Sequence, residues 1–504
     1  MKMRKPVTYL FLILFISLHP HHALSSGKEG TAAAPPSVGE NTGNAVEPAP
    51  NTGKLVREGL KVEFSAKTSK GAGGPGGKIY GGDFVDISFR ISDGETGELL
   101  RGLFPGAWMD MGETILGKGE GFSTCKDRAG LYLQGLVGIR PMIDLNSYFL
   151  LVMNQDPTIA VIDPIIGITG ITKLYAQIIL KRAGADWTKT ADEKRLFVSM
   201  PVADMVAVVN TDTFAVTHNL PAGDTPMRVR LQPDGKYLWV GNDSRKEGES
   251  GVTVIEADSL KRAARIATGK GHHEIAVSDD SRYAFVTNRE YGTVSVIDVQ
   301  KLEKIKDIET GTTPISLAYS TLSKSLYVAD GKEGVITVVD GKSHEIVTRI
   351  VTKPGLGPMG FSQDGRWGVV VNSREDLAYV FDPSVNAIVH EISVGDEPYQ
   401  VAFSRSFAYV RSLGTERVSM IDLTELGKEG TVPVTTFAAG QKAPNVVRDV
   451  SLADSIIEAP GEAAVMVVSP ADTTVYYYME GMNAPMGNFR NYGHRPRAAQ
   501  VIDR

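Results

Sequence analysis

The stretch YAFVTNREYGTVSVID, residues 283–298, decides the fold of this chain. Two runs of alternating apolar residues flank an Asn-containing break and Gly292, which predicts two β-strands joined by a turn. Related pairs of runs occur at 148–163, 196–210, 237–256, 325–340, 367–382 and 407–422, with a looser pair at 464–478. One valine in the first run of each pair marks the repeat: Val152, Val198, Val240, Val286, Val328, Val370, Val410 and Val467.

Successive marker valines lie 46, 42, 46, 42, 42, 40 and 57 residues apart. A period of about 40–47 residues built only from short strands is typical of the blades of a β-propeller. The repeats therefore predict an all-β chain with an eight-bladed propeller over residues 131–504, and a seven-bladed ring is the alternative. The alternating segment RAAQVIDR, residues 497–504, is expected to pair with the first blade and close the ring, which removes exposed sheet edges.

The N-terminal segment, residues 1–25, has a basic start, an apolar run and small residues at Ala23 and Ser25, as in a secretory signal peptide. The apolar run over 7–18 is short of the roughly 20 residues that a membrane-spanning helix needs. We expect a periplasmic, cell-surface or secreted protein with no transmembrane segment after cleavage; an uncleaved anchor is the alternative. Residues 26–54 are rich in Gly, Ala and Pro and predict a disordered linker.

Residues 55–125 predict a small, non-repeating β-module, because LKVEFSA (60–66) and FVDISFRIS (84–92) alternate strictly. These runs, together with D-x-x-T-G-x-x-L (93–100) and AWMDM (107–111), resemble the YtkA-like family of immunoglobulin-type sandwiches. The resemblance implies a β-sandwich of the kind found beside copper-handling and respiratory proteins. Met109 and Met111 would lie on one face of a strand, where paired thioethers could hold Cu(I); a pair of core methionines is the alternative.

The charge balance argues against a nucleic-acid partner. The formal net charge is −6, and removal of residues 1–25, which takes away three basic residues and no acid, makes it about −9. An acidic protein has no general attraction for nucleic acid or anionic membranes.

Cys125 is the only cysteine, so no internal disulfide is expected. It could be a free thiol, an intermolecular link, a metal ligand or a buried inert side chain.

The segments YAFVTN, GTVSVID and P-x-x-V-x-[FL] resemble the YVTN-repeat β-propellers of exported and surface-layer proteins. They also resemble the larger group of cytochrome-d1-haem-domain-like propellers. This resemblance implies eight blades and raises a d1-type haem as a cofactor. The nitrite reductases of that group carry a separate c-haem domain, and this sequence has no C-x-x-C-H motif, which excludes that enzyme.

The residues that follow the proline of each repeat should surround the mouth of the central channel. They are Met142, Met227, His273, Ile315, Tyr399 and Asn445, with Met359 near the same place. In GKGHHEIAVSDD (269–280), His272 replaces the proline and Glu274 takes the place of Arg228. We therefore predict a cofactor site of His272, His273 and Glu274, with His273 and neighbouring methionines as ligands of copper or a haem. A hydrogen-bonded plug and a catalytic histidine are the alternatives.

A second candidate site lies in YYYMEGMNAPMGNFRNYGHRPR (476–497). Met479, Met482, Met486 and His494 offer thioether and imidazole ligands for copper. The alternative is a cap whose methionines fill a gap in the last blade, since methionine is a favoured gap filler. Three further histidines are expected to be exposed in or near outermost strands: His218, His344 and His390.

No P-loop, G-x-S-x-G, H-E-x-x-H, EF-hand or Cys–His zinc pattern occurs in the sequence. The sequence therefore favours an exported binding or scaffold protein of the cell envelope over an enzyme. We expect this protein to be associated with respiratory or copper-handling components. Its expected partner is an envelope protein or a small ligand on the channel-mouth face. The alternative is a redox protein that holds copper or a d1-type haem there.

Overall fold

The computed structural model of this chain falls into two units, Met1–Asn146 and Ser147–Arg504, which are described separately below. The residues it describes are 12–15, 52–57, 59–68, 85–100, 106–109, 143–144, 148–163, 173–246, 248–415, 417–428, 432–438, 456–458, 464–469, 473–491 and 493–503. Almost all of the predicted linker lies outside these ranges, as do Met111, Cys125, Met142 and Asn445.

The first unit contains two three-stranded antiparallel sheets among its described residues. One sheet has the order β2-β3-β4, with β2 Thr52–Arg57, β3 Leu60–Thr68 and β4 Val85–Asp93; the other has the order β1-β5-β6, with β1 Leu12–Phe15, β5 Gly106–Met109 and β6 Ile143–Asp144. Strands β3 and β4 cover the two strictly alternating runs, and the rings of Phe64 and Phe89 lie 5.7 Å apart across them. The immunoglobulin-type sandwich over residues 55–125 stays a prediction.

The second unit is built from eight four-stranded antiparallel sheets among its described residues. In sheet order the strands are β10 (Trp187–Lys189), β11 (Arg195–Met200), β12 (Met205–Asn210), β13 (Ala215–Pro221); β14 (Pro226–Leu231), β15 (Tyr237–Asn242), β16 (Gly251–Glu256), β17 (Arg262–Ala267); β18 (Ile275–Val277), β19 (Tyr283–Asn288), β20 (Thr293–Asp298), β21 (Glu303–Glu309); β22 (Pro314–Ser320), β23 (Ser325–Asp330), β24 (Val335–Asp340), β25 (Ile346–Val351); β26 (Leu356–Phe361), β27 (Gly368–Asn372), β28 (Leu377–Asp382), β29 (Ala387–Ser393); β30 (Pro398–Phe403), β31 (Phe407–Ser412), β32 (Arg417–Asp422), β33 (Val434–Ala438); β34 (Ile456–Glu458), β35 (Ala464–Ser469), β36 (Thr474–Met479), β37 (Gly487–Arg490); and β38 (Pro496–Asp503), β7 (Tyr148–Asn154), β8 (Thr158–Asp163), β9 (Lys173–Ile179). The described part of the chain contains no α-helix.

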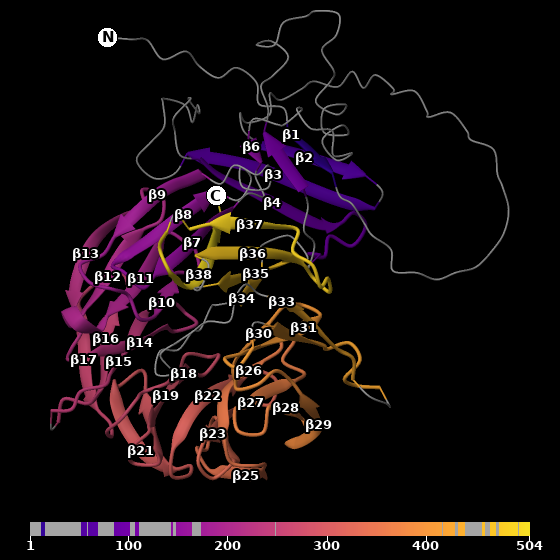
Figure 1. Ribbon diagram of the computed structural model, residues 1–504. Helices are drawn as coiled ribbons and strands as arrows, with labels where there is room; N and C mark the ends of the chain where they lie inside the picture. Colours follow the sequence, from indigo (N-terminus) through magenta and orange to yellow (C-terminus); the bar gives the residue numbers. More distant parts are fainter. Residues whose placement is uncertain are drawn as a thin grey trace, which may run out of the picture. The chain divides into compact units, whose positions relative to one another are not determined.

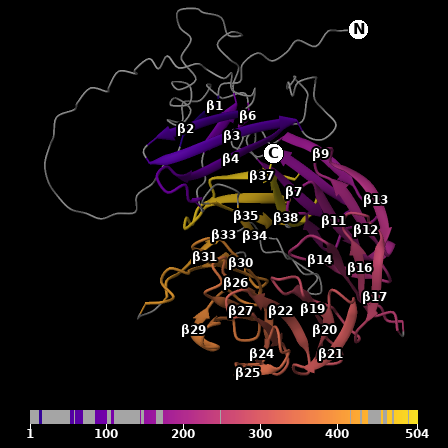
Figure 2. The same cartoon turned by 180° about the vertical axis from the view of Figure 1, so that it is seen from behind.

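The sheets of this unit are arranged radially, as in a β-propeller. In Figures 1 and 2 the first strands β14, β18, β22, β26 and β30 lie toward the centre, and the fourth strands β17, β21, β25 and β29 lie at the periphery. The second strands β15 and β19 are buried along most of their length, the first strand β14 is partly buried and the fourth strand β17 is mostly exposed. The ring is formed by the sheets of the second unit, Ser147–Arg504.

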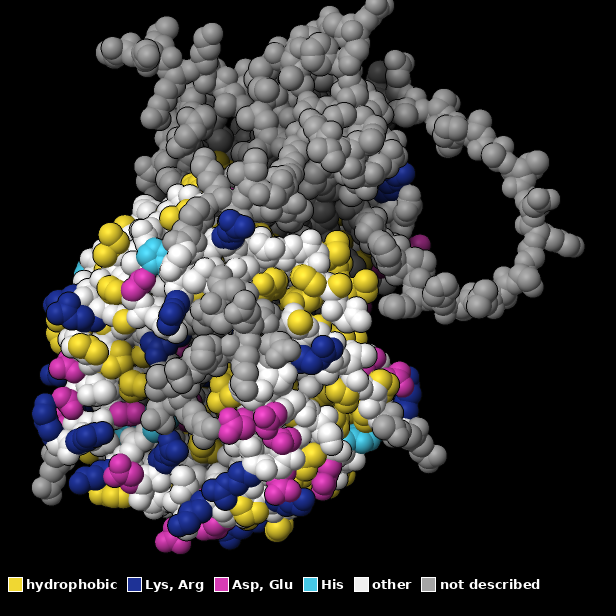
Figure 3. All heavy atoms as spheres, in the orientation of Figure 1, with side chains coloured by type: hydrophobic (Ala, Val, Ile, Leu, Met, Phe, Trp, Pro, Cys, Tyr) yellow, Lys and Arg dark blue, Asp and Glu magenta, His cyan; other side chains and the backbone are white. Residues whose placement is uncertain are grey.

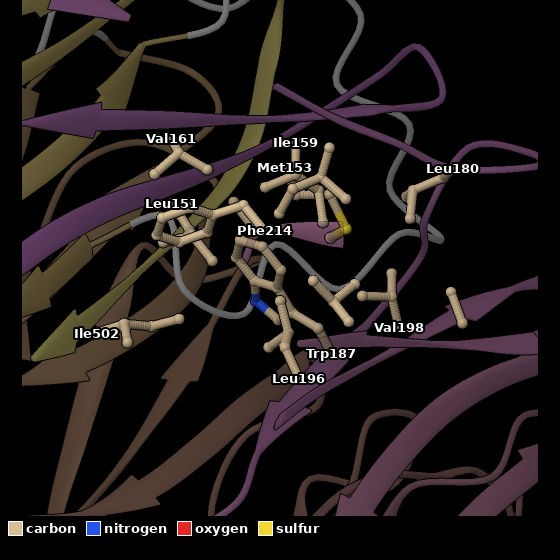
Figure 4. Packing of buried hydrophobic residues seen from close by; sticks show 14 of the residues in the cluster. Leu151, Met153, Ile159, Val161, Leu180, Trp187, Leu196, Val198, Phe214 and Ile502 are labelled. Atoms are coloured by element: carbon tan, nitrogen blue, oxygen red, sulfur yellow. The ribbon is translucent and has the colours of Figure 1, made fainter. Parts of the chain in front are cut away.

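The last strand of the chain closes the ring. Strand β38 pairs antiparallel with β7, with Ala499 opposite Val152, so one sheet combines the C-terminal strand with the first three strands of this unit. Ile502 contributes to a buried cluster that also contains Leu151 and Trp187 (Figure 4). The alternation in RAAQVIDR predicts this strand and its partner.

The polar residues of the repeat hold the turns in place. At the end of β19 the Asn288 side chain accepts the N–H of Gly269 at 2.7 Å and donates to Ser295 Oγ at 2.9 Å. At the end of β20 the Asp298 carboxylate accepts the N–H groups of Gln300 and Lys301 at 2.9 and 3.0 Å. The Asn and Asp of the repeat therefore satisfy backbone donors where the ladder hydrogen bonds stop.

Candidate functional site

Three successive sheets carry charged residues at one equivalent position. Trp187, Val229 and Ile275 each pair with the marker valine of the neighbouring strand. The residues that precede them in the chain are Asp186, Arg228 and Glu274. All three therefore lie at the same level of the ring, next to the connections between sheets. This end of the ring, which also holds the turns between second and third strands, is called the connection face below.

Arg228 joins these three positions. Its Nε and Nη2 donate to Glu274 Oε1 at 2.9 and 2.6 Å, and Nη1 lies 4.0 Å from Asp186 Oδ2. The same Asp186 oxygen accepts the N–H of Val229 at 3.0 Å. Burial by itself would lower the pKa of Arg228, but the charges of Glu274 and Asp186 outweigh it and raise the pKa. The guanidinium is therefore a permanent cation bridging neighbouring sheets.

His272 extends the chain of contacts. Its Nδ1 lies 2.6 Å from Asp243 Oδ2 and its Nε2 lies 2.9 Å from Glu274 Oε1. Burial opposes protonation of the ring, but hydrogen bonds to the two carboxylates prevail and raise the pKa of His272 to about 9. Burial likewise opposes ionisation of Glu274, yet the charge of Arg228 and the bond from His272 hold its pKa well below the ordinary value. At neutral pH both ring N–H groups of His272 therefore donate to carboxylates.

His273 is a structural residue, fully buried at 0% exposure. Its Nδ1 lies 2.7 Å from the Thr287 carbonyl oxygen, which can only accept, so this nitrogen carries the proton. Nε2, 2.8 Å from Ser250 Oγ, then accepts from the hydroxyl. Burial lowers the pKa of the ring. Gly241 allows His273 to approach closely, because a Cβ at residue 241 would lie 3.0 Å from the His273 carbonyl oxygen and 3.1 Å from its Cβ.

The ligand set predicted at the channel mouth stays a prediction. Both ring nitrogens of His272 and of His273 are hydrogen-bonded to protein, as the hydrogen-bonded alternative requires. The set Asp186, Arg228, Asp243, His272 and Glu274 is called the inner charge cluster below. The sequence analysis did not identify Asp186 or Asp243. The signal for Asp186 is its place directly before Trp187, the residue that pairs with the marker valine Val198.

Three further residues of the predicted cofactor site, Met227, Tyr399 and Met359, lie outside the inner charge cluster. Met227 is half-buried, and its carbonyl oxygen accepts from Ser199 Oγ at 2.8 Å. Tyr399 is half-buried as well. The placement of Met359 was wrong, because its register opposite Val370 makes it equivalent to Val229, and its side chain packs in a buried cluster. A changed spacing in the approach to β26 shifts the methionine into the core.

The second predicted site is divided between the two ends of one sheet. Met482 and Met486 lie in the turn that joins β36 to β37, whereas His494 follows the far end of β37. Strand β36 has six residues, which separates the two ends by about 17 Å. His494 instead pairs through Nδ1 with Asp156 Oδ2 at 2.5 Å. The four residues Met479, Met482, Met486 and His494 therefore do not form one site.

The remaining predicted residues have diverse positions. Met109 ends β5, outside the part of the chain whose side chains are described. His218 is exposed on β13, as predicted, and His390 on β29 is half-buried with Nε2 2.9 Å from the Leu426 carbonyl oxygen. The prediction for His344 was wrong, because this side chain is buried. Within the described ranges no group of three His, Cys, Asp or Glu side chains could hold a metal ion.

Comparison with known proteins agrees with this fold. A model of the YNCE-like β-propeller family matches residues 247–364. The solved structure of the dihydro-haem d1 dehydrogenase NirN in complex with DHE is 14% identical, with 73% of this chain and 78% of that chain covered and a TM-score of 0.54. Apo AztD from Citrobacter koseri is 13% identical, with 71% and 98% covered and a TM-score of 0.53. No curated protein matches the chain.

These findings define an all-β protein of the β-propeller class. At such low sequence identity the solved structures share the fold and nothing more can be transferred from them. In the described ranges, no helix is both long and apolar enough to cross a membrane. Function therefore has to be argued from this chain's own residues.

Proposed function

We propose that this chain is an exported binding or scaffold protein of the cell envelope, whose propeller engages a partner on the connection face. The observation that carries the proposal is the inner charge cluster. Its five side chains come from three successive sheets and satisfy one another through contacts such as Arg228 with Glu274 at 2.6 Å and His272 with Asp243 at 2.6 Å. Such a network fixes the connections between sheets and favours a preformed surface for binding.

The chemistry of the cluster supports binding over catalysis at this place. A catalytic base needs a pKa near the working pH, whereas the pKa of His272 is raised to about 9 and that of Glu274 is held far below neutrality. A haem or copper ion would need a free imidazole nitrogen, and the ring nitrogens of His272 and His273 have protein partners. We therefore favour partner binding over a copper-ligand or haem-ligand role for His272 and His273.

Charges of both signs are mixed on the face that Figure 3 shows. On the face in Figure 3 basic and acidic side chains are interspersed over the described residues, without a continuous basic stripe. Opposite charges are also paired among the described residues, as in Lys324 with Asp279 and Lys353 with Glu375. An envelope protein or a small ligand fits this mixed surface better.

Site-specific photo-crosslinking in cells tests the proposal. A photoreactive residue replaces Val202 or Tyr291, which are exposed in turns of the connection face. Leu322 and Val385, exposed in turns at the opposite ends of their sheets, are the matched controls. We expect a discrete crosslinked product in the extracytoplasmic fraction from the first pair only. Equal products from both pairs, or retention of the chain in the cytoplasm, would contradict the proposal.

Soft-metal binding at the β36–β37 turn is a second candidate function, favoured by exposure. Met482 and Met486 are 53% and 66% exposed, so they fill no gap, whereas Met479 packs against a buried cluster. Exposed thioethers suit Cu(I), a soft ion. The candidate pair is therefore Met482 and Met486, without His494.

Titration of the full chain with Cu(I) against a competing chelator tests this candidate. We expect the double variant M482L/M486L to lose binding that the natural chain shows. The variant H494Q is the control, because His494 lies at the other end of the sheet and should leave Cu(I) affinity unchanged. Equal affinity in the natural chain and M482L/M486L would rule out this site.

A further inference from the structure

A histidine occupies an apolar plug position between two sheets. In the turn between the third and fourth strands, one residue of each of several sheets has a left-handed backbone: Phe214, Leu260, Leu302, His344 and Asn386, with φ between 53° and 60°. Phe214, Leu260 and Leu302 pack against buried hydrophobic clusters. His344 takes the same place in the sheet of β22–β25, so an ionisable ring stands where the three preceding sheets carry hydrocarbon.

The surroundings of His344 suit only its neutral form. The side chain is 7% exposed, and its ring meets Tyr283 edge-on at 4.3 Å and Phe285 at 6.2 Å. Both aromatic residues belong to β19 of the preceding sheet. Nε2 is buried without a hydrogen-bond partner. Placing a charge on this ring would bury a cation in the seam with no hydrogen-bond partner for Nε2, which is costly.

Charged groups around the ring do not compensate for that cost. On its own turn Asp340 and Glu345 attract a proton, but Glu345 is engaged with Lys306 of β21 at 2.8 Å. Lys306 itself repels a positive charge on His344. Arg282, which precedes β19, lies over the Tyr283 ring at 5.7 Å, and its Nη2 is 3.3 Å from Asp298 Oδ2.

We propose that His344 makes the seam between the sheets β18–β21 and β22–β25 acid-sensitive: the neutral ring belongs to the seam, and protonation opens it. Burial, and then the charge of Lys306, lower the pKa of His344 in the closed seam. An open seam restores the ordinary value of about 6.5. The open form therefore binds more protons below pH 6.5, and closure weakens as the pH falls from there. Above that pH the contribution to closure is constant.

Hydrogen exchange of the full chain, measured by mass spectrometry on peptides from β19 and β25, tests this proposal. After correction for intrinsic exchange rates, we expect opening to increase by up to about 16-fold between pH 6.5 and pH 5, since the open form, with a pKa of about 6.5, is already half protonated at pH 6.5. The variants H344L and H344N carry side chains that the equivalent turns use at Leu260 and Asn386. Both should lose this increase.

The exposed His218 supplies the matched control, and H218L should keep the natural pH dependence. Both H344L and H344N are measured, so that a folding defect in one of them does not decide the outcome. Equal acid-induced opening in the natural chain, H344L and H344N would overturn the proposal, as would a flat profile in the natural chain.

Discussion

The charge state of His272 offers a quantitative test of the inner charge cluster. In the variant H272Q a neutral side chain replaces the imidazole beside Asp243 and Glu274. The side chain of His272 is only 19% exposed, so solvent screens its ion pairs weakly. A pKa of about 9 against an ordinary 6.5 corresponds to up to about 3 kcal/mol of folding free energy, at about 1.4 kcal/mol per pH unit.

The direction of the pH effect follows from the raised pKa of His272. The folded chain holds this proton more tightly than the unfolded chain, so the stabilisation is fully present below pH 6.5. It is lost as the pH rises through about 9. The natural chain should therefore lose up to about 3 kcal/mol more than H272Q when the pH is raised from 6.5 to 9.5.

Urea unfolding followed by tryptophan fluorescence measures this difference. Trp187 and Trp239, two of the four tryptophans, are buried in the sheets next to Asp186 and Arg228, so part of the signal reports on this part of the ring. The variant H218Q, with its change at an exposed histidine, should behave like the natural chain. Identical pH dependence in the natural chain and H272Q would refute the assignment of a protonated, doubly paired His272.

Three further perturbations probe other parts of the fold. R228M should cost about 3 kcal/mol in urea unfolding because Glu274 keeps a buried charge, and R228M/E274M should recover much of it; equal losses in both would disprove the pairing. A chain that ends before residue 496 loses β38 and should aggregate in light scattering and melt without cooperativity, unlike one that lacks only residue 504. G251A should lower stability by more than about 2 kcal/mol, because its Cβ would meet backbone at φ +145°. G235A, at φ +76° with open space around it, should cost about 1 kcal/mol. Similar costs for the two variants would be inconsistent with the crowding at Gly251.

Much of the architecture was accessible from the sequence because its determinants are local. Alternation along residues 283–298 specifies strands with one apolar face, and its recurrence at marker valines such as Val286 predicts repeated sheets. The same reasoning correctly paired the C-terminal strand with β7. Strand existence depends on a period of two residues, and that period can be recognised without knowing any partner.

The candidate site was only partly accessible. The break in the repeat at His272–Glu274 located the inner charge cluster, but it did not show that both histidines are hydrogen-bonded to protein. Whether His273 is a ligand depends on Ser250 and Thr287, and nothing local to residue 273 identifies them as partners. His344 was likewise expected to be exposed, because its proximity to an outer strand gave no indication of the Tyr283 ring that covers it.

The sequence by itself determined the strands, their buried faces and the repeat that joins them into a propeller. Tertiary structure alone decided which charges meet: Asp186, Arg228 and Glu274 are 42 and 46 residues apart along the chain and adjacent across the ring. It also separated His494 from Met482 and Met486, which are near in sequence. The physical reason is that apolar alternation is a property of one strand, whereas a charged side chain takes its partner from whichever strand the closed ring places beside it.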